Sequence, residues 1–204
     1  MQKELNRDYF LWESFKNGDD DAFFNLYDQY VDALLGFGMH FTQDVDFLKD
    51  CIHDLFLDLY KYRKRLSGTD NVKFYMFRSL KRKIQNELSK KSIFSTDKNL
   101  EIAQIELEPA HDDVIIETEI KQENSDILKT AIRKLTDQQQ QALFLKFEQN
   151  LSYPEIAEIL NISTESARTN IYRAIKALRI SIQKGHTSFN MLLMFYRLYS
   201  RIYR

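Results

Sequence analysis

Residues 152–179 constrain the fold most, because their pattern fits two helices joined by a turn that forces a steep crossing. Ser152 is a typical helix N-cap, and Glu155 stands at the third position of a capping box. Asn161 begins a short turn and is a residue type that tolerates the left-handed backbone at helix ends. The spacing of small and aliphatic residues then predicts one buried stripe, formed by Ala167, Ile171, Ala174 and Leu178.

The other face of this second helix is polar and cationic, with hydroxyl groups and one aromatic ring. Such side chains can contact phosphates, base edges and thymine methyl groups in the major groove of DNA. An αα-hairpin in an unrelated bundle is the alternative, but the caps, the short turn and the face chemistry together favour DNA binding. The residues predicted to make these contacts are Ser166, Arg168, Thr169, Tyr172, Arg173 and Lys176.

Proline and glycine are scarce, with two and five of 204 residues, a composition that favours long helices over many-turned sheets. We therefore predict an all-α protein of two small helical domains. The single cysteine, Cys51, cannot form an intramolecular disulfide, and the N-terminal sequence has no apolar core typical of a signal peptide. The most apolar run, residues 191–203, is too short and too interrupted by arginine to span a bilayer. We expect a cytoplasmic protein with no membrane span.

The net charge of −1 conceals blocks of opposite sign along the chain. Residues 1–59 hold thirteen acidic and four basic side chains, whereas residues 60–91 hold eleven basic and two acidic ones. Residues 97–126 are again acidic and contain the step from Glu108 to Pro109, which disfavours helix. We predict a helical domain at 1–93, a flexible acidic linker at 94–127 that keeps two modules apart, a helix-turn-helix domain at 128–184 and an amphipathic tail at 185–204.

The first domain carries apolar residues at helical spacings in three segments. The predicted helices run from the Asp19–Asp21 cluster to about residue 35, from 45 to 62, and from 72 to about 88. Asp50, Asp54 and Asp58 form a row that is expected to face water or a partner. Basic and aromatic residues intermingle between 60 and 91, a pairing that suits single-stranded nucleic acid, although solvated charges on a three-helix bundle are the simpler alternative.

Together the two domains resemble bacterial sigma factors of the extracytoplasmic-function (ECF) type. The resemblance rests on AFFNLYDQYVDALL, DCIHDLFLDLYKYRKRL and FYMFRSLKRKIQNELSKK in the first domain, and on LTDQQQQALFLKF, LSYPEIAEILNIS and TESARTNIYRAIKALR in the second. It implies a factor that binds core RNA polymerase, directs promoter-specific initiation on duplex DNA and melted non-template strand, and is regulated by an anti-sigma factor. It implies no small-molecule substrate and no cofactor.

The resemblance also implies roles for individual residues. Asp50, His53 and Asp54 would dock on the coiled-coil clamp of core polymerase. The helix-turn-helix would recognise the minus-thirty-five element. The turn at 63–71 would capture a base flipped out of the melted strand, and stacking contacts can offset the free-energy cost of extruding that base. The residues implied for minus-ten contacts are Arg63, Lys64, Arg65, Asn71, Lys73, Arg78, Lys81 and Arg82.

Several positions depart from the family pattern. Thr136, Gln140 and Glu165 stand where proline, arginine and glycine are frequent, so the grip on phosphates is expected to be weaker. The other departures are Cys51 and His53 in the docking helix and Arg82 in the basic helix.

Two other classes of function are alternatives. A free-standing helix-turn-helix regulator with an α-helical sensor domain would bind DNA without polymerase, usually as a dimer. An enzyme would have to rely on Cys51 and His53, which lie two residues apart and so point to different sides of a helix. The sequence has no zinc spacing, phosphate loop or nucleophile elbow, so we expect neither catalysis nor a bound metal. The tail at 185–204 either packs on the second domain or binds an anti-sigma partner.

Overall fold

The computed structural model describes residues 2–66, 68–69, 71–94 and 130–183, and the regular elements of this part of the chain are helical. The all-α prediction is therefore confirmed for the described residues. Most of the predicted linker and the whole predicted tail lie outside them. The elements are α1 (Gln2–Lys16), α2 (Asp20–Gly38), α3 (Val45–Tyr62), the 3₁₀ turn η1 (Arg63–Arg65), α4 (Val72–Phe94), α6 (Asp137–Leu143), the π-helical turn η2 (Phe144–Glu148), α7 (Tyr153–Leu160) and α8 (Thr164–Gln183).

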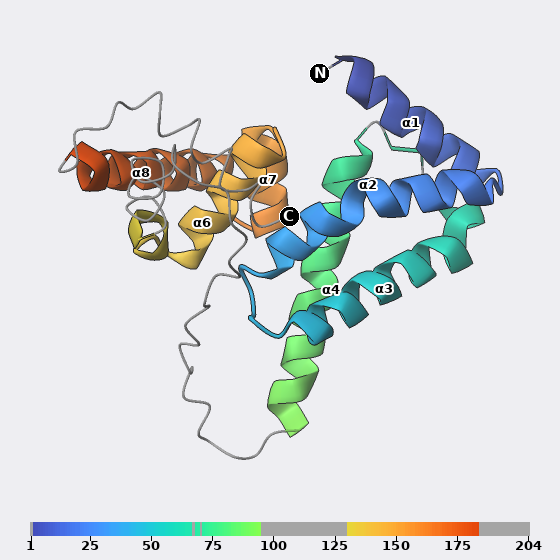
Figure 1. Ribbon diagram of the computed structural model, residues 1–204, viewed down its shortest axis with the longest axis horizontal. Coiled ribbons are helices and arrows are strands. Elements are labelled where there is room, and N and C mark those ends of the chain that lie inside the picture. Colours follow the sequence, from blue (N-terminus) through green and yellow to red (C-terminus); the bar gives the residue numbers. More distant parts are fainter. Residues whose placement is uncertain (1, 67, 70, 95–129, 184–204) are drawn as a thin grey trace, which may run out of the picture.

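The helices form two groups, which we call the first module (α1 to α4) and the second module (α6 to α8) (Figure 1). In the first module α2 and α3 both pack across α4, and α1 lies along α2. In the second module α8 packs against α6 and α7, and α7 is the helix that lies beside α4. Among the described helices, none combines the length and apolar character that crossing a bilayer requires.

The three helices predicted for the first module are confirmed as α2, α3 and α4. Asp19 caps α2 by accepting a hydrogen bond from the amide of Ala22 at 3.1 Å, and Asp44 caps α3 through the amide of Phe47 at 2.9 Å. Acidic residues at these N-termini also interact favourably with the helix dipole. The starts of both helices therefore follow directly from local sequence.

Helix α1 was not predicted, because it is held by a few long-range contacts rather than by a clear apolar stripe. Trp12 is fully buried, and its ring centroid lies 5.2 Å from that of Tyr75 in α4. The carboxylate of Asp8 accepts hydrogen bonds from the Tyr30 hydroxyl at 2.5 Å and from the Gln29 amide at 2.6 Å. These partners are distant in sequence, so the residues of α1 alone did not indicate them.

The helix-turn-helix has the local geometry that its sequence predicts. Ser152 caps α7 in a reciprocal capping box with Glu155. Asn161 adopts the left-handed conformation, with φ 57° and ψ 49°, and the amide of Ile162 donates to the carbonyl of Ala157 at 2.9 Å. The predicted stripe of α8 is buried, at Ala167, Ile171, Ala174 and Leu178. The direction of α8 relative to α7 is thus set by a tight, fully capped turn.

The left-handed backbone at Asn161 gives a stability prediction. Asn161→Ala places a residue with no local hydrogen-bonding side chain at positive φ, and we expect it to lower the free energy of unfolding by about 1 kcal/mol. Asn161→Gly should lower it less, because glycine adopts this conformation without steric cost. Urea unfolding followed by circular dichroism measures both, and equal losses in the two variants would contradict the argument.

Candidate nucleic-acid interface

The exposed face of α8 presents the side chains predicted for duplex DNA. Tyr172 is 67% exposed on this face. Arg168 lies over the ring of Tyr153 in α7, 5.5 Å from the centroid, and its Nη1 is 3.7 Å from Oε2 of Glu165. Of the predicted residues, Thr169 is partly exposed. The other five are exposed, and these are Ser166, Arg168, Tyr172, Arg173 and Lys176.

The residues predicted for the minus-ten strand fall into two sets. Lys64 and Arg65 in η1 and Arg82 in α4 are exposed. Arg63 is half-buried, with its guanidinium 4.5 Å from the ring centroid of Tyr60 and 3.7 Å from Oδ1 of Asp20. The remaining four contact the second module, and these are Asn71, Lys73, Arg78 and Lys81.

Lys81 makes the most buried of these contacts. Its side chain is only 6% exposed, and Nζ donates to the carbonyl oxygen of Ile159 at 2.7 Å. Burial lowers the pKa of Lys81 below its ordinary value. One turn earlier on α4, Nη1 of Arg78 lies 3.0 Å from Oε1 of Glu158, in an ion pair that is half exposed. The acceptors of both cations belong to α7.

Two further contacts extend this seam toward the start of α4. The amide of Asn71 donates to the carboxylate of Glu155, the residue that closes the α7 capping box. Nζ of Lys73 donates to the carbonyl of Gln149 at 3.4 Å. The linker was expected to keep the modules apart, and this expectation is wrong, because the two modules are in contact. Cationic side chains of α4 donate to acceptor oxygens of α7 and of the turn before it. The boundaries of the linker stay a prediction.

Aromatic packing completes the contact between the modules. The ring of Phe144 in η2 stacks on Phe37 with centroids 5.9 Å apart and lies 6.1 Å from Phe77. Gly36 faces this ring, and a Cβ added there would lie 3.5 Å from it, at an ordinary contact distance. Sequence reasoning missed this junction. A glycine within an apolar helix is a weak signal of close approach, but it does not identify the partner.

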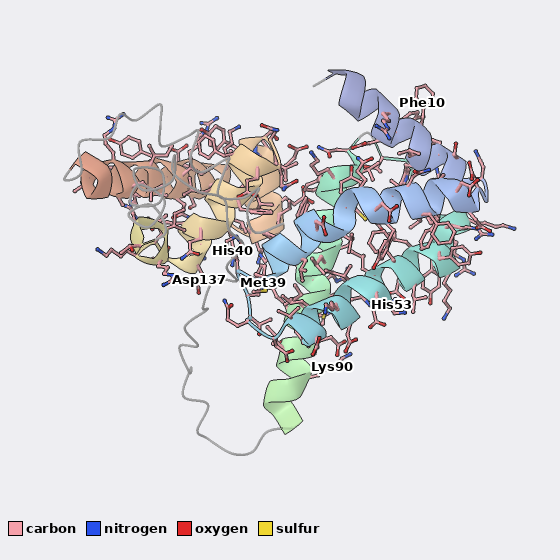
Figure 2. The ribbon with its side chains drawn as sticks, viewed as in Figure 1. Phe10, Met39, His40, His53, Lys90 and Asp137 are labelled. Atoms are coloured by element: carbon pink, nitrogen blue, oxygen red, sulfur yellow. The ribbon has the colours of Figure 1, made fainter. Side chains whose placement is uncertain are left out.

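His40 lies at the same junction, just beyond the end of α2, and Figure 2 shows it next to Asp137 of α6. Its ring is 5.5 Å from that of Phe144, and its carbonyl accepts a hydrogen bond from Gln141 at 3.4 Å. Burial lowers the pKa of His40, and a hydrogen bond with Gln140 and the charge of Asp137 oppose this only in part. The imidazole is therefore favoured in its neutral form.

A cavity of about 420 Å³ lies between α3 and α4, next to η1. The rings of Tyr62 and Tyr75 contribute to its wall, together with leucines 55, 59 and 66. Its polar wall is mostly cationic or neutral, with Ser79, Arg82, Lys83, Asn86 and Lys90 beside Asp58 and Glu87. Flat rings beside cations can hold a base and its phosphate. Neither the cavity nor the presence of Asn86 and Lys90 in its wall was predicted from the sequence.

The predicted docking residues lie on the outer side of α3. Asp50, His53 and Asp54 are all exposed. Asp54 and Asp58 also share a partner in α4, because Nζ of Lys83 lies 3.6 Å and 2.9 Å from their carboxylates. Burial alone would lower the pKa of Lys83, but the two carboxylates outweigh it and raise that pKa above its ordinary value. Asp50 thus faces water, whereas Asp54 and Asp58 also pair with Lys83 of α4.

The side chains considered for chemistry are not brought together. Cys51 is buried, and burial is the main cause that raises the pKa of its thiol, which keeps the thiol protonated and weakly nucleophilic. His53 is exposed, so the two point to different sides of α3 as predicted. Within the described ranges, the histidine, cysteine and acidic side chains form no cluster able to hold a metal ion.

Comparison with known proteins agrees with this geometry. Residues 125–178 match the family model of sigma-70 region 4. Over 170 residues, which are 82% of this chain and 93% of the relative, the sequence is 26% identical to RNA polymerase sigma factor YlaC of Bacillus subtilis. Over 173 residues, 80% of this chain and 90% of the relative, it is 25% identical to ECF RNA polymerase sigma factor SigW of the same organism.

Two solved structures are similar in fold. One is sigma factor RpoE of Bartonella quintana in complex with the anti-sigma factor NepR, with a TM-score of 0.59 and 17% identity over 80% of this chain and 98% of that one. The other is CnrH in complex with the cytosolic domain of CnrY, with a TM-score of 0.55 and 16% identity over 87% and 98%.

Fold and surface together define a two-module helical protein with a DNA-reading helix-turn-helix. The region 4 match covers most of the second module, and the sigma-factor relatives extend over both modules. These matches support a sigma factor of the ECF type in the sigma-70 family. The recognition made from the sequence is confirmed.

The buried His40 gives a pH prediction. The pKa of His40 is 6.5 in the unfolded chain and lower in the folded one, so unfolding takes up a proton as the pH falls below 6.5. The free energy of unfolding should therefore decrease from about pH 6.5 downward, until the pH reaches the folded pKa. Replacing His40 by glutamine, which cannot titrate, should remove this part of the loss.

Urea unfolding at about pH 7.5 and about pH 5.5, on either side of the ordinary histidine pKa, measures the effect. His53→Gln removes an exposed imidazole and is the matched control, which should keep the wild-type pH dependence. If His40→Gln and His53→Gln lose the same stability on acidification, burial of His40 is not the cause.

Proposed function

We propose that this sigma factor binds core RNA polymerase in the cytoplasm and directs initiation through two separate DNA contacts, one in each module. The observation that carries the proposal is α8, whose buried stripe and tight capped turn aim a polar, cationic face at solvent. A helix of this kind fits the major groove of B-DNA, which is about 12 Å wide. The chain itself needs no catalytic group for this role.

For the minus-thirty-five element, we assign α8 to the major groove. Arg168 and Arg173 would donate to phosphates or guanine edges, and Tyr172 would contact a thymine methyl group or a phosphate. Ser166 stands near the start of α8, where its hydroxyl lies 2.8 Å from that of Ser163. Thr169 and Lys176 would add contacts along the same face. The stacking of Arg168 on Tyr153 limits the conformations of the guanidinium before DNA binds.

For the minus-ten element, we assign the flipped base to the cavity between α3 and α4. Its aromatic wall, Tyr62 and Tyr75, offers stacking surfaces, and stacking on an aromatic ring is worth about 1–3 kcal/mol per base. Lys64, Arg65 and Arg82 are exposed near it and would neutralise the backbone on either side. The cavity therefore supports the role that the family resemblance implied for the neighbouring turn.

For polymerase, we assign the outer side of α3, where Asp50, His53 and Asp54 are all exposed. An acidic surface of this kind suits a cationic partner and speeds association. We also propose an anti-sigma partner, because the similar sigma factor RpoE was solved in complex with the anti-sigma factor NepR.

The minus-thirty-five assignment predicts a selective loss in transcription. Arg173→Ala removes one base or phosphate contact, which is worth about 1–3 kcal/mol, so we expect run-off transcription with core polymerase to fall roughly tenfold at subsaturating factor. The promoter is chosen by mapping initiation sites with and without the factor. Lys134→Ala is the matched control, because it removes an exposed cation of the same module outside α8. Equal activities of the two variants would refute the role of Arg173.

The docking assignment predicts a loss in polymerase affinity. Asp50→Lys reverses an exposed charge at the proposed contact and should weaken binding to core polymerase by about tenfold or more. Asp46→Lys makes the same change one turn earlier in α3, where the carboxylate side chain is 94% exposed, and should bind normally. Fluorescence anisotropy with labelled factor and core enzyme measures both. Unaltered binding by Asp50→Lys places the contact elsewhere.

A further inference from the structure

Helix α1 carries none of the residues predicted for DNA or polymerase, yet it contacts the wall of the cavity between α3 and α4. Trp12 is fully buried, and its ring centroid lies 5.2 Å from that of Tyr75, with the two ring planes 59° apart. Tyr75 belongs to the wall of the cavity, whereas Trp12 does not. Trp12 therefore packs on a cavity-lining ring from outside the cavity.

The same helix borders the turn at 63–71, which was predicted to capture the flipped base. A Cβ added at Gly68 would lie 3.6 Å from Oε1 of Glu13, so the turn passes directly beside α1. Nζ of Lys16 lies 3.0 Å from that oxygen, and only 18% of the Lys16 side chain is exposed. Two parts of the proposed site, the stacking ring and the turn, thus rest on one helix.

Helix α1 is itself fixed to α2 at a point away from the cavity. The carboxylate of Asp8 accepts hydrogen bonds from the Tyr30 hydroxyl at 2.5 Å and from the Gln29 amide at 2.6 Å. Burial, and next the hydrogen bond with Asp8, raise the pKa of Tyr30, so its hydroxyl keeps the proton that it donates. None of these three residues lines the cavity. Asp8 therefore holds α1 in place without contacting the proposed site.

The orientation of Tyr75 matters because a base stacks best on a ring that is already in place. Tyr75 is half-buried at the start of α4, so burial alone does not fix its ring. A side chain that becomes ordered only on binding loses rotamer freedom, and this loss subtracts from the affinity. A large aromatic neighbour such as Trp12 removes that freedom beforehand, through a tilted contact of the kind that aromatic pairs prefer.

We propose that Trp12 is a positioning residue of the minus-ten site, and that α1 is the support that presents Tyr75 to the captured base. This role rests on the proposed function, because it requires base capture in the cavity. Trp12 touches no DNA and acts only through Tyr75. Its loss should therefore remove affinity that depends on the base and spare affinity that depends on phosphate contacts, such as the contact assigned to Arg82.

Abasic substitution measures the base-dependent part of the affinity. The probe is a single-stranded oligonucleotide with the non-template minus-ten sequence of a mapped promoter, either intact or with one base removed at each position in turn. It is titrated into holoenzyme assembled from core polymerase and the full-length factor. In the wild type, removal of the captured base should weaken binding about tenfold, the value of one stacking contact.

Variants of Trp12 should change this ratio between the intact and the abasic strand. Trp12→Leu should reduce it to about twofold, because ordering one side chain on binding costs about fivefold in affinity. Trp12→Phe keeps an aromatic neighbour for Tyr75 and should restore most of the ratio.

Loss of a buried aromatic residue also weakens the fold, and Phe56→Leu is the control for that effect. Phe56 is 2% exposed, and its ring contacts Phe23 and Tyr27 on the α2 side of α3. It is not part of the cavity wall. Phe56→Leu should therefore keep the wild-type ratio, even where its stability and its overall affinity fall.

A second pair of variants leaves Trp12 and every cavity residue in place. Asp8→Ala removes the carboxylate that accepts from Tyr30, so it should loosen α1 and lower the ratio. Asp8→Asn keeps an acceptor oxygen and should retain the ratio.

The outcomes separate the role of Trp12 from the function on which it rests. A wild-type ratio in Trp12→Leu overturns the positioning role, as does an equal fall in Phe56→Leu. If Trp12→Leu does not fold, equal ratios in Asp8→Ala and Asp8→Asn overturn it. A wild-type holoenzyme that binds every abasic strand as tightly as the intact one would instead overturn base capture itself, and the role of Trp12 with it.

Discussion

The ammonium of Lys81, buried against the end of α7, is the contact on which the arrangement of the two modules depends. A cation removed from water is unfavourable unless an acceptor replaces its hydration. The carbonyl of Ile159, 2.7 Å away at the negative end of a helix dipole, is such an acceptor. Lys81 therefore stays buried only while α7 stays in place. The neighbouring pair of Arg78 and Glu158 is half exposed and adds less.

The second module does not rely on that contact for its own geometry. Ser152 and Asn161 determine where α7 begins and ends, and the buried stripe of α8 determines which face is left outside. The DNA-reading face can consequently keep its shape whether the modules are joined or separate. The first module differs, because part of its cationic surface is either paired with α7 or free for a strand.

Local sequence was sufficient wherever a structure depends on neighbours within a few residues. The bounds of α3, the caps of α7 and the left-handed Asn161 all follow from residues at fixed short spacings. The exposed residues of α8 were predicted for the same reason, since the face opposite a buried stripe is defined by helical geometry. Helix α1 and the cavity beside Tyr62 were missed, because their contacts join segments far apart in the chain.

By itself the sequence determined the helices, the helix-turn-helix and the sigma-factor resemblance, because periodicity, capping and motif order are properties of a linear chain. Only the tertiary structure decided which of the cations predicted for the minus-ten strand are available. Lys81 and Arg82 are adjacent in sequence and alike in charge, yet one is buried under α7 and the other is exposed. The difference arises because successive residues of a helix point in different directions, and only the packing of α4 shows which direction meets another helix.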